Sequence, residues 1–406
     1  MSTEHSMGMD MTNGYPKSLQ AWLIASFGLE LGVAALAFAM TWTASAYGPD
    51  TASAVLTLTL APTVVLGLLG GLLADRLGPR RTMIASILGL VAISVILAAV
   101  AWGAGTSPAL LFVIAALMGT ASAFFRPASA VFARLFVADR ELGTAMARVG
   151  MAGQLARTIG PPLGGLLIGM LTLAGVAWIG AAGAAVMLCV LLLIRVPRRV
   201  QPSDVRLGVR GILDAMSAVR LRRDVPALLA SVAIIAGAVI PVVALGIPLA
   251  ARERGWSASE AGLIEAGWIA GGLVCTAWFG WKGTLTNAWK PMFVGPIVIT
   301  LGLGLLAIAP RWEVAVSSTV LVGAGVVLFT AHAFPTYVLL APATMLSRFQ
   351  SLLLFVQQAP QLVVAPLVGF AGEALGMGAV IGAFGALALP ASLLVVSNRS
   401  LRDFRM

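Results

Sequence analysis

Ionisable side chains inside long apolar segments are the residues of this sequence that could do chemistry. Glu30 lies in the middle of ASFGLELGVAALAF, and Arg157 lies within a second apolar segment. A charge at the centre of a lipid bilayer costs at least about 2.5–3.5 kcal/mol, so each such residue needs a reason. We predict that Glu30 binds a proton or a cation, and that Arg157 takes part in proton coupling with it. Two alternatives stay open: a purely structural Glu30–Arg157 ion pair, and an Arg157 that binds an anionic group of a ligand.

Further polar side chains interrupt apolar segments in the second half of the chain. His332 is followed closely by Tyr337, and Gln357, Gln358 and Gln361 lie close together in one later segment. Gln357 and Gln361 are four residues apart, so they lie on one face of a helix. We predict that these side chains contact a bound small molecule, with hydrogen bonds between helices as the alternative. The full set of predicted ligand contacts is Glu30, Arg157, His332, Tyr337, Gln357, Gln358 and Gln361.

Two other charges, Arg126 and Glu265, lie nearer to the ends of their apolar segments. The long side chain of Arg126 could extend to the membrane–water interface. For Glu265 we keep two interpretations, a residue of an outer vestibule and a residue of proton coupling.

The composition shows which elements must position these residues. Of the 406 residues, 59% are hydrophobic and only 10% are charged, against about 25% charged in soluble domains. The apolar runs are about 20 residues long, which is the length a helix needs to cross a bilayer. The two cysteines are predicted to pack in the apolar core, because they form neither a disulfide framework nor a metal-binding spacing. The chain is therefore predicted to be an all-α integral membrane protein.

Twelve apolar segments divide into two groups of six. We expect a tail at 1–19, a six-helix bundle at 20–195, a linker at 196–225, a second bundle at 226–397 and a tail at 398–406. Eight arginines lie between Arg195 and Arg223, and the linker is predicted to form an amphipathic helix on the membrane surface, with a solvated basic linker as the alternative. The predicted segments are 20–46, 51–74, 83–102, 109–132, 144–171, 174–195, 226–250, 259–280, 291–309, 314–340, 348–370 and 377–397.

Basic residues predict how the chain is oriented. With both termini in the cytoplasm, three of the 26 Lys and Arg residues fall outside, two lie within segments, and the other 21 are cytoplasmic. The net charge of +10 is then expected to face the anionic inner leaflet of the membrane rather than a nucleic acid. Abundant Arg, Ala, Gly and Val are typical of a GC-rich bacterial genome. We expect a multi-pass protein of the bacterial cytoplasmic membrane.

A charged cluster, GGLLADRLGPRRTM at 70–83, separates the second and third segments. Gly71 permits close helix approach, and Gly78 with the following proline permits a sharp reversal. A charged cluster between two bundles that rock against one another can form a contact in one state and lose it in the other. We predict a conformational latch made of Gly71, Asp75, Arg76, Gly78, Arg80 and Arg81.

This stretch resembles the loop signature G-x-L-a-D-r-x-G-r-k of the major facilitator superfamily. The resemblance extends over the twelve segments and implies two pseudo-symmetric six-helix bundles.

A second motif, ARTIGPPLGG at 156–165, resembles the antiporter motif of exporters in that superfamily, g-x-x-x-G-P-x-x-G-G. Gly160, Pro161, Gly164 and Gly165 match, whereas Ala156 replaces the first glycine. The matching residues also permit a bent, tightly packed helix, which is the structural alternative. FFRPASAVFARLF and TASAVLTLTLAPTVVLGLLGGLLADR are similar to the macrolide-efflux and enterobactin-exporter branch. Ala115 stands where many drug–proton antiporters carry an arginine, so that proton relay is not carried over.

These resemblances imply a secondary active exporter of small amphiphilic molecules, drugs or secondary metabolites, coupled to protons through alternating access. A proton-coupled importer of a small nutrient or siderophore-like compound is the alternative. The sequence contains no phosphate-binding loop, no H-E-x-x-H and no G-x-S-x-G, so neither ATP-driven transport nor an enzyme is expected. We expect no cofactor, no metal and no nucleic-acid partner. The partners are the substrate, protons and the lipid bilayer, and a monomer is the default of the family.

Overall fold

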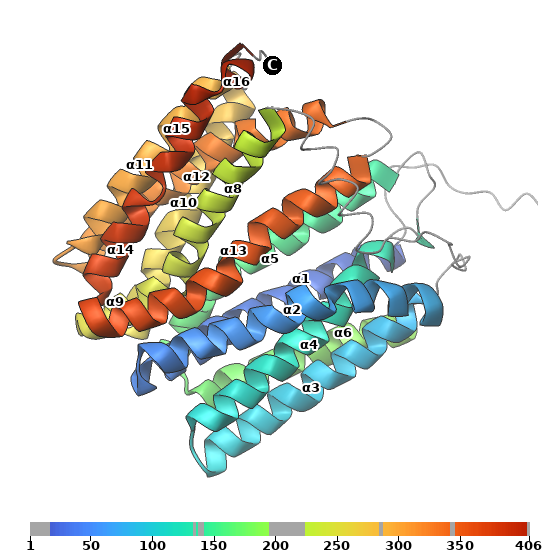
Figure 1. The fold of residues 1–406 in the computed structure, drawn as a ribbon. Coiled ribbons are helices and arrows are strands. Elements are labelled where there is room, and N and C mark those ends of the chain that lie inside the picture. The colour runs from blue at the N-terminus through green and yellow to red at the C-terminus, as the bar shows by residue number, and fades with distance from the viewer. Residues whose placement is uncertain are drawn as a thin grey trace, which may run out of the picture.

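The chain folds almost entirely into long helices (Figure 1). In the computed structural model, residues 17–132, 135–136, 142–194, 224–283, 287–341 and 346–403 are described. Within these residues, eleven helical stretches are long and apolar enough to cross a membrane. The predicted amphipathic helix in the linker, residues 1–16 of the N-terminal tail and residues 404–406 of the C-terminal tail lie outside the described residues.

The first half contains six long helices that correspond to the first six predicted segments. A short 3₁₀ turn, η1 (Ser45–Tyr47), joins the first two of them. The helices are α1 (Lys17–Ala44), α2 (Pro49–Leu77), α3 (Pro79–Gly103), α4 (Pro108–Phe132), α5 (Leu142–Met170) and α6 (Leu173–Leu193).

The second half repeats the pattern, with breaks in its first and last membrane segments. The first is divided into α8 (Asp224–Pro241), a π-helical turn η4 (Val242–Gly246) and α9 (Ile247–Glu253). The last is divided into α14 (Met377–Ala386) and α15 (Leu389–Ser397), and a short α16 (Arg399–Asp403) follows. The remaining helices are α10 (Ala258–Lys282), α11 (Trp289–Ala307), α12 (Trp312–Leu340) and α13 (Leu346–Leu375). Each predicted segment thus matches a helix or consecutive helices, and the predicted fold class is confirmed.

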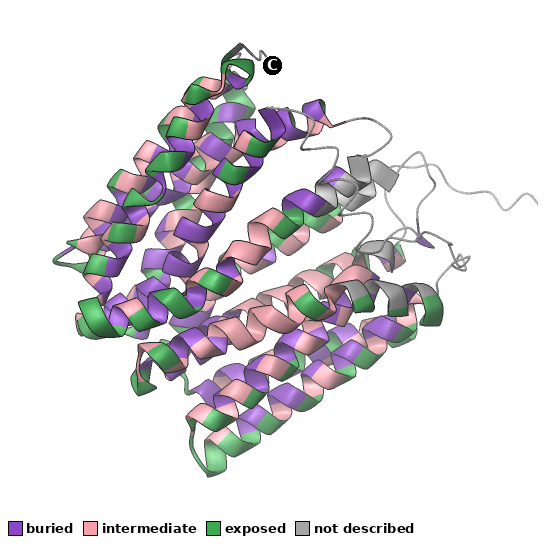
Figure 2. Ribbon diagram, viewed as in Figure 1, coloured by how far each residue is buried: buried purple, intermediate pink, exposed green. Residues whose placement is uncertain are grey.

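Apolar side chains cover both the inner and the outer faces of the helices. On α3, Ile87 and Leu97 are fully buried, whereas Leu88 and Ile96 are about half exposed (Figure 2). Exposed apolar surface of this extent is unfavourable in water and is suited to lipid. The hydrocarbon chains of a bilayer would therefore cover the outer faces of the helices.

Small residues let the helices of each half approach closely. Gly70 of α2 lies against the backbone of Ala123 in α4, and Gly323 of α12 lies against the backbone of Trp268 in α10. An added Cβ at either glycine would collide with that backbone. Packing through small residues is how membrane helices associate without a hydrophobic driving force between them.

The two halves meet at one end of the bundle. An added Cβ at Gly165 of α5 would lie 2.6 Å from Cα of Gly262 in α10, and one at Gly369 of α13 would lie 3.0 Å from the carbonyl oxygen of Pro49 in α2. We call this end, formed by residues 42–53, 162–169, 252–262 and 369–376, the closed end. Away from the closed end, α8, α10 and α12 of the second half diverge from the helices of the first half, whereas α13 follows the direction of α5 in this view (Figure 1).

Candidate functional site

The glycines of the GPPLGG motif place α5 between the two halves. Gly160 and Gly164 pack against Ala34 and Ala35 of α1, so closely that an added Cβ at either glycine would collide with α1. Gly165, on another face of α5, forms the contact with α10 in the opposite half. Because α5 is covered by protein on two sides, it tolerates more polar residues than its neighbours. It is the long helix of the first half that is not among the eleven stretches apolar enough to span a membrane by composition.

Close packing of α1 on α5 brings the two predicted coupling residues together. Arg157 Nη1 donates a hydrogen bond to Glu30 Oε2 at 3.1 Å, across 127 positions of sequence. Arg157 Nη2 also contacts Gln154 Oε1 at 3.5 Å. An added Cβ at Gly153 would lie 3.1 Å from Arg157 Nη1, so this glycine leaves room for the guanidinium. The ion pair is one of the arrangements expected for Glu30 and Arg157, and the sequence did not indicate the contributions of Gly153 and Gln154.

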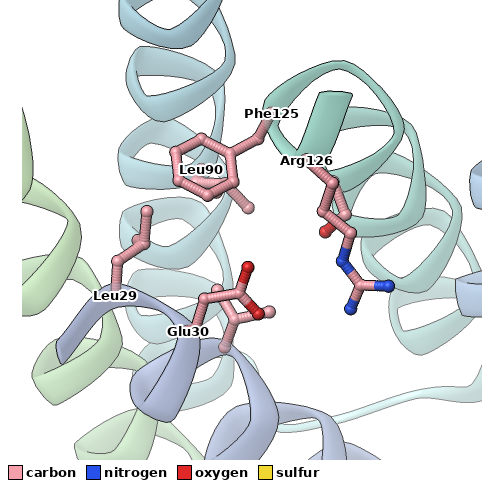
Figure 3. Close-up of a pocket in the computed structure, with 7 residues that line it drawn as sticks. Leu29, Glu30, Leu90, Phe125 and Arg126 are labelled. Atoms are coloured by element: carbon pink, nitrogen blue, oxygen red, sulfur yellow. The ribbon is translucent and has the colours of Figure 1, made fainter. Parts of the chain in front are cut away.

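A pocket lies beside this ion pair, between α1, α3 and α4 of the first half. Glu30 and Arg126 extend into the same space from α1 and α4 (Figure 3). Arg126 therefore lines the pocket in this structure, six residues before the end of α4. The other lining residues, which sequence reasoning missed, are Leu29, Val33, Leu90, Ser122 and Phe125.

The charges around the pocket do not balance. Arg126 interacts electrostatically with both Glu30 and Arg157, so one carboxylate serves two guanidinium groups. The side chain of Glu30 is 15% exposed and that of Arg157 is 37% exposed, so the pair is in contact with the surrounding medium. Glu30, Arg126 and Arg157 together carry one excess positive charge when all three are charged.

His332 and Tyr337 lie in the packed interior of the second half. The ring of His332 is fully buried, with Nδ1 3.1 Å from the carbonyl oxygen of Leu328, and it packs edge-to-face on Phe279 of α10 at 5.0 Å. Tyr337 Oη donates a hydrogen bond to the carbonyl oxygen of Phe349 at 2.9 Å. These contacts give both side chains structural partners, and their role as ligand contacts stays a prediction.

The three glutamines lie on α13, where Gln361 is buried and Gln357 and Gln358 are partly exposed. Gln361 Nε2 donates a hydrogen bond to the carbonyl oxygen of Gln357 at 2.7 Å, within the same helix. Gln361 thus stabilises its own helix beside Pro360, and contact of the three glutamines with a ligand stays a prediction.

The predicted latch lies at the junction of α2 and α3. Gly78 adopts a φ of +87°, and Pro79 begins α3 directly after it, which makes the expected reversal. Arg80 donates hydrogen bonds to the carbonyl oxygens of Leu191 and Leu192 at the end of α6, with distances of 2.8–3.2 Å. This is a cap within the first half. Arg76 and Arg81 are exposed, and the side-chain surroundings of Gly71 and Asp75 lie outside what the structure describes.

An arginine that sequence reasoning did not single out joins the two halves. Arg252 of α9 donates hydrogen bonds to Ser45 Oγ at 2.8 Å and to the carbonyl oxygen of Trp42 at 2.9 Å. Its guanidinium also lies 4.6 Å from the centre of the Trp42 ring. The sequence indicated an arginine outside the membrane, but no spacing revealed its partners, 207 and 210 residues away.

Comparisons with known proteins agree with this architecture. The sequence matches the Major Facilitator Superfamily over residues 22–365. A variant of the nucleoside transporter NupG superposes with a TM-score of 0.72 at 13% identity, covering 94% of this chain and 99% of that one. A peptide transporter POT in complex with sulfate gives 0.71 at 17% identity, covering 97% and 96%. A POT family transporter in complex with 5-aminolevulinic acid gives 0.67 at 15% identity, covering 95% and 96%.

These identities establish the fold alone, and no curated protein sequence matches the chain. The sequence match, by contrast, covers most of the chain, from α1 of the first half into α13 of the second. This multi-pass membrane protein therefore belongs to the Major Facilitator Superfamily and is a transporter, not an enzyme.

Proposed function

We propose that this transporter is a proton-driven exporter of small amphiphilic molecules. The observation that carries the proposal is the Glu30–Arg157 ion pair between α1 and the glycine-motif helix α5. A carboxylate in such a pair binds a proton only by giving up its charged partner. Proton binding at Glu30 thus loosens the contact between α1 and α5 at the pocket.

The position of α5 lets this local event reach the contact between the halves. One face of α5 packs on α1 through Gly160 and Gly164, and another packs on α10 through Gly165. A shift of α5 relative to α1 must therefore be accommodated at the α5–α10 contact of the closed end. Alternating access then follows from two arrangements of the halves, with the protonation of Glu30 biasing the choice between them.

The distribution of basic residues supports an orientation and a location for this cycle. With 21 of 26 basic residues on the side of the termini, the termini are cytoplasmic and the closed end faces outward. Because the halves are in contact at the outward-facing closed end, this structure is then the inward-facing arrangement. We place the chain in the cytoplasmic membrane of a bacterium, as a monomer, with the linker at 196–225 joining the two bundles on the inner surface.

A second candidate is import of an anionic nutrient together with a proton, and the charge balance of the pocket favours it. When Glu30 is protonated, Arg157 loses its carboxylate partner, and none of the other residues that line the pocket carries a negative charge to balance Arg126. An anion then binds most favourably at the same time as the proton, which is the linkage of a symporter. A cationic substrate would instead compete with the proton for Glu30, which is the linkage of an antiporter.

Accumulation assays in an efflux-deficient bacterium separate the two candidates. Cells carrying the transporter are loaded with a panel of cationic, neutral and anionic dyes and antibiotics, with and without a protonophore. Export predicts lower accumulation of at least one compound than in cells without the transporter, and the protonophore should restore it. Accumulation of an anionic compound above the level of control cells, abolished by the protonophore, would overturn export in favour of the symporter.

Two variants connect the assay to the site. Glu30→Gln removes the titrating group and should abolish the effect of the proton gradient. Glu313→Gln is the matched control, because Glu313 is an exposed carboxyl in the first turn of α12, far in sequence from the ion pair. Equal loss of transport in both variants would show that the effect of Glu30→Gln is not specific to the ion pair.

A further inference from the structure

Glu265 of α10 is a buried carboxyl group that the ion pair at the pocket does not involve. Its side chain is 4% exposed, and its Oε1 atom is fully buried without a hydrogen-bond partner among the described residues. The sequence left two interpretations for this residue, an outer-vestibule residue and a residue of proton coupling. In this arrangement of the halves the side chain is instead enclosed by protein.

The register between α10 and α5 places Glu265 beside the closed end. Gly169 contacts Ser259, and Gly165 contacts Gly262, so the two helices run antiparallel in close contact. Glu265 follows Gly262 by three residues, which puts it on a neighbouring part of the same helix face, one turn away from the closed end.

The other side of α10 faces outward, which fixes the direction of Glu265. Leu263 and Val274 are 39% and 70% exposed and, at a separation of 11 residues, lie on one stripe of the helix. At about 100° per residue, Glu265 is rotated by about 200° from Leu263, two residues earlier, and so lies roughly opposite this stripe, toward the interior of the protein. Glu265 thus lies on the side of α10 that faces the space between the halves.

The charged groups on the helices that pack around Glu265 either interact with residues other than Glu265 or lie elsewhere on their helices. On α5, Arg157 pairs with Glu30 and Arg148 lies near the opposite end of that helix. On α9, Arg252 bonds to η1 and α1, and Glu253 accepts a hydrogen bond from the backbone N–H of Met377. The rest are Glu260, which caps α10, Lys282 at its far end, Glu313 in the first turn of α12, and His332, whose ring packs on Phe279.

We propose that Glu265 is a proton-binding site whose occupancy stabilises the closed end. A buried carboxylate without a charged partner is far less favourable than a buried carboxylic acid. Closing the α5–α10 contact therefore requires that a proton from water bind to the Glu265 carboxylate and form a neutral O–H group. Opening of the contact admits water, and the proton can dissociate again.

This site is distinct from Glu30 in its position and its environment. Glu30 is paired with an arginine and partly exposed in the first half, whereas Glu265 is buried in the second half and its Oε1 has no hydrogen-bond partner in the part of the chain that the structure describes. The proposal rests on the alternating access proposed above, but it requires neither the direction of transport nor the identity of the substrate. It predicts that pH alone shifts the population of the closed end.

Pulse EPR between spin labels in the two halves measures this shift without substrate or gradient. Ala104, after α3, and Ala374, in α13, are exposed. Ala374 belongs to the closed end, and Ala104 lies on the same side of the first half, two residues before Thr106, which is hydrogen-bonded to Tyr47. Labels are attached to Ala104→Cys and Ala374→Cys in a chain whose natural cysteines are replaced by Cys189→Ser and Cys275→Ser. Raising the pH should convert a short-distance population to a longer one. Glu265→Gln, which stays neutral, should keep the short distance at every pH.

Glu313→Gln is the control, and it should leave the pH dependence of the labelled parent unchanged. If the distance still shifts with pH in Glu265→Gln, the proposal is overturned. It is also overturned if Glu30→Gln, rather than Glu265→Gln, removes the shift. If Glu265→Gln does not fold, infrared spectroscopy of the labelled parent provides the second test. A protonated carboxylic acid band should disappear over the same pH range as the short distance, and a spectrum without that band would refute the assignment. Failure of either test leaves the accumulation assay for transport unaffected.

Discussion

Arg252 offers the sharpest test of how the two halves are held together. It donates two hydrogen bonds to Ser45 and Trp42 of the first half and lies over the Trp42 ring. Arg252→Ala removes these contacts and leaves the α5–α10 and α2–α13 contacts of the closed end in place. The substitution should therefore shift the population away from the closed end without unfolding the protein.

The size of the shift follows from the contacts that are lost. Hydrogen bonds from a charged donor contribute about 1.5–3 kcal/mol when buried, and less here because the Arg252 side chain is exposed. A cation–π contact at an exposed site adds about 0.5–1 kcal/mol. We expect a total of about 1–3 kcal/mol, which lowers the ratio of closed to open molecules by a factor of about 5–150.

Arg254 provides a matched control, because its contacts are of the same kinds but stay within one half. It donates hydrogen bonds to the carbonyl oxygens of Leu306 and Ala307 at 3.1 and 2.6 Å, and it lies 5.1 Å from the centre of the Trp256 ring. The assay is pulse EPR between labels at Ala104→Cys and Ala374→Cys. Arg254→Ala should lower thermal stability and leave the label distance unchanged. Equal distance distributions for Arg252→Ala and the parent would refute the reasoning.

Three further substitutions separate structural from functional roles. Gly160→Ala should lower the free energy of unfolding by about 1–3 kcal/mol, because the added Cβ collides with α1. Gly28→Ala is the control: an added Cβ there meets open space, so stability should not change. Thermal unfolding in detergent measures both effects. Arg80→Ala should lower stability through loss of its hydrogen bonds to α6 without changing the EPR distance, and a changed distance would support the latch prediction instead. Tyr337→Phe should cost about 1 kcal/mol of stability with KM unchanged, and a raised KM would establish substrate contact.

Hydropathy and charge predicted the helices well because the bilayer constrains them strongly. All twelve segments form helices, and most of their boundaries lie within a few residues of the predicted ones. The π-helical turn at Val242–Gly246 and the break between α14 and α15 were not predicted, because the apolar pattern continues through both. A membrane span tolerates such local irregularity where neighbouring helices cover the backbone.

The candidate site was predicted only as far as single residues carry their chemistry. Glu30 and Arg157 were recognisable because each is a charge in an apolar run, and their pairing was one of the arrangements considered. The partners of Arg252 and the burial of Glu265 could not be predicted, because both depend on the register between the two halves. That register is set by contacts such as Gly165 with Gly262, which have no signature in sequence spacing.

Exchange and gradient-driven transport in proteoliposomes test the central claim, that protonation of Glu30 couples transport to the proton gradient. With a substrate identified in cells, wild type and Glu30→Gln are compared in counterflow, which needs no net proton movement, and in transport driven by an imposed pH gradient. We predict that Glu30→Gln keeps counterflow but loses the response to the gradient, while Glu313→Gln behaves as wild type in both. A Glu30→Gln variant that still accumulates substrate against its gradient when driven by pH would contradict the account.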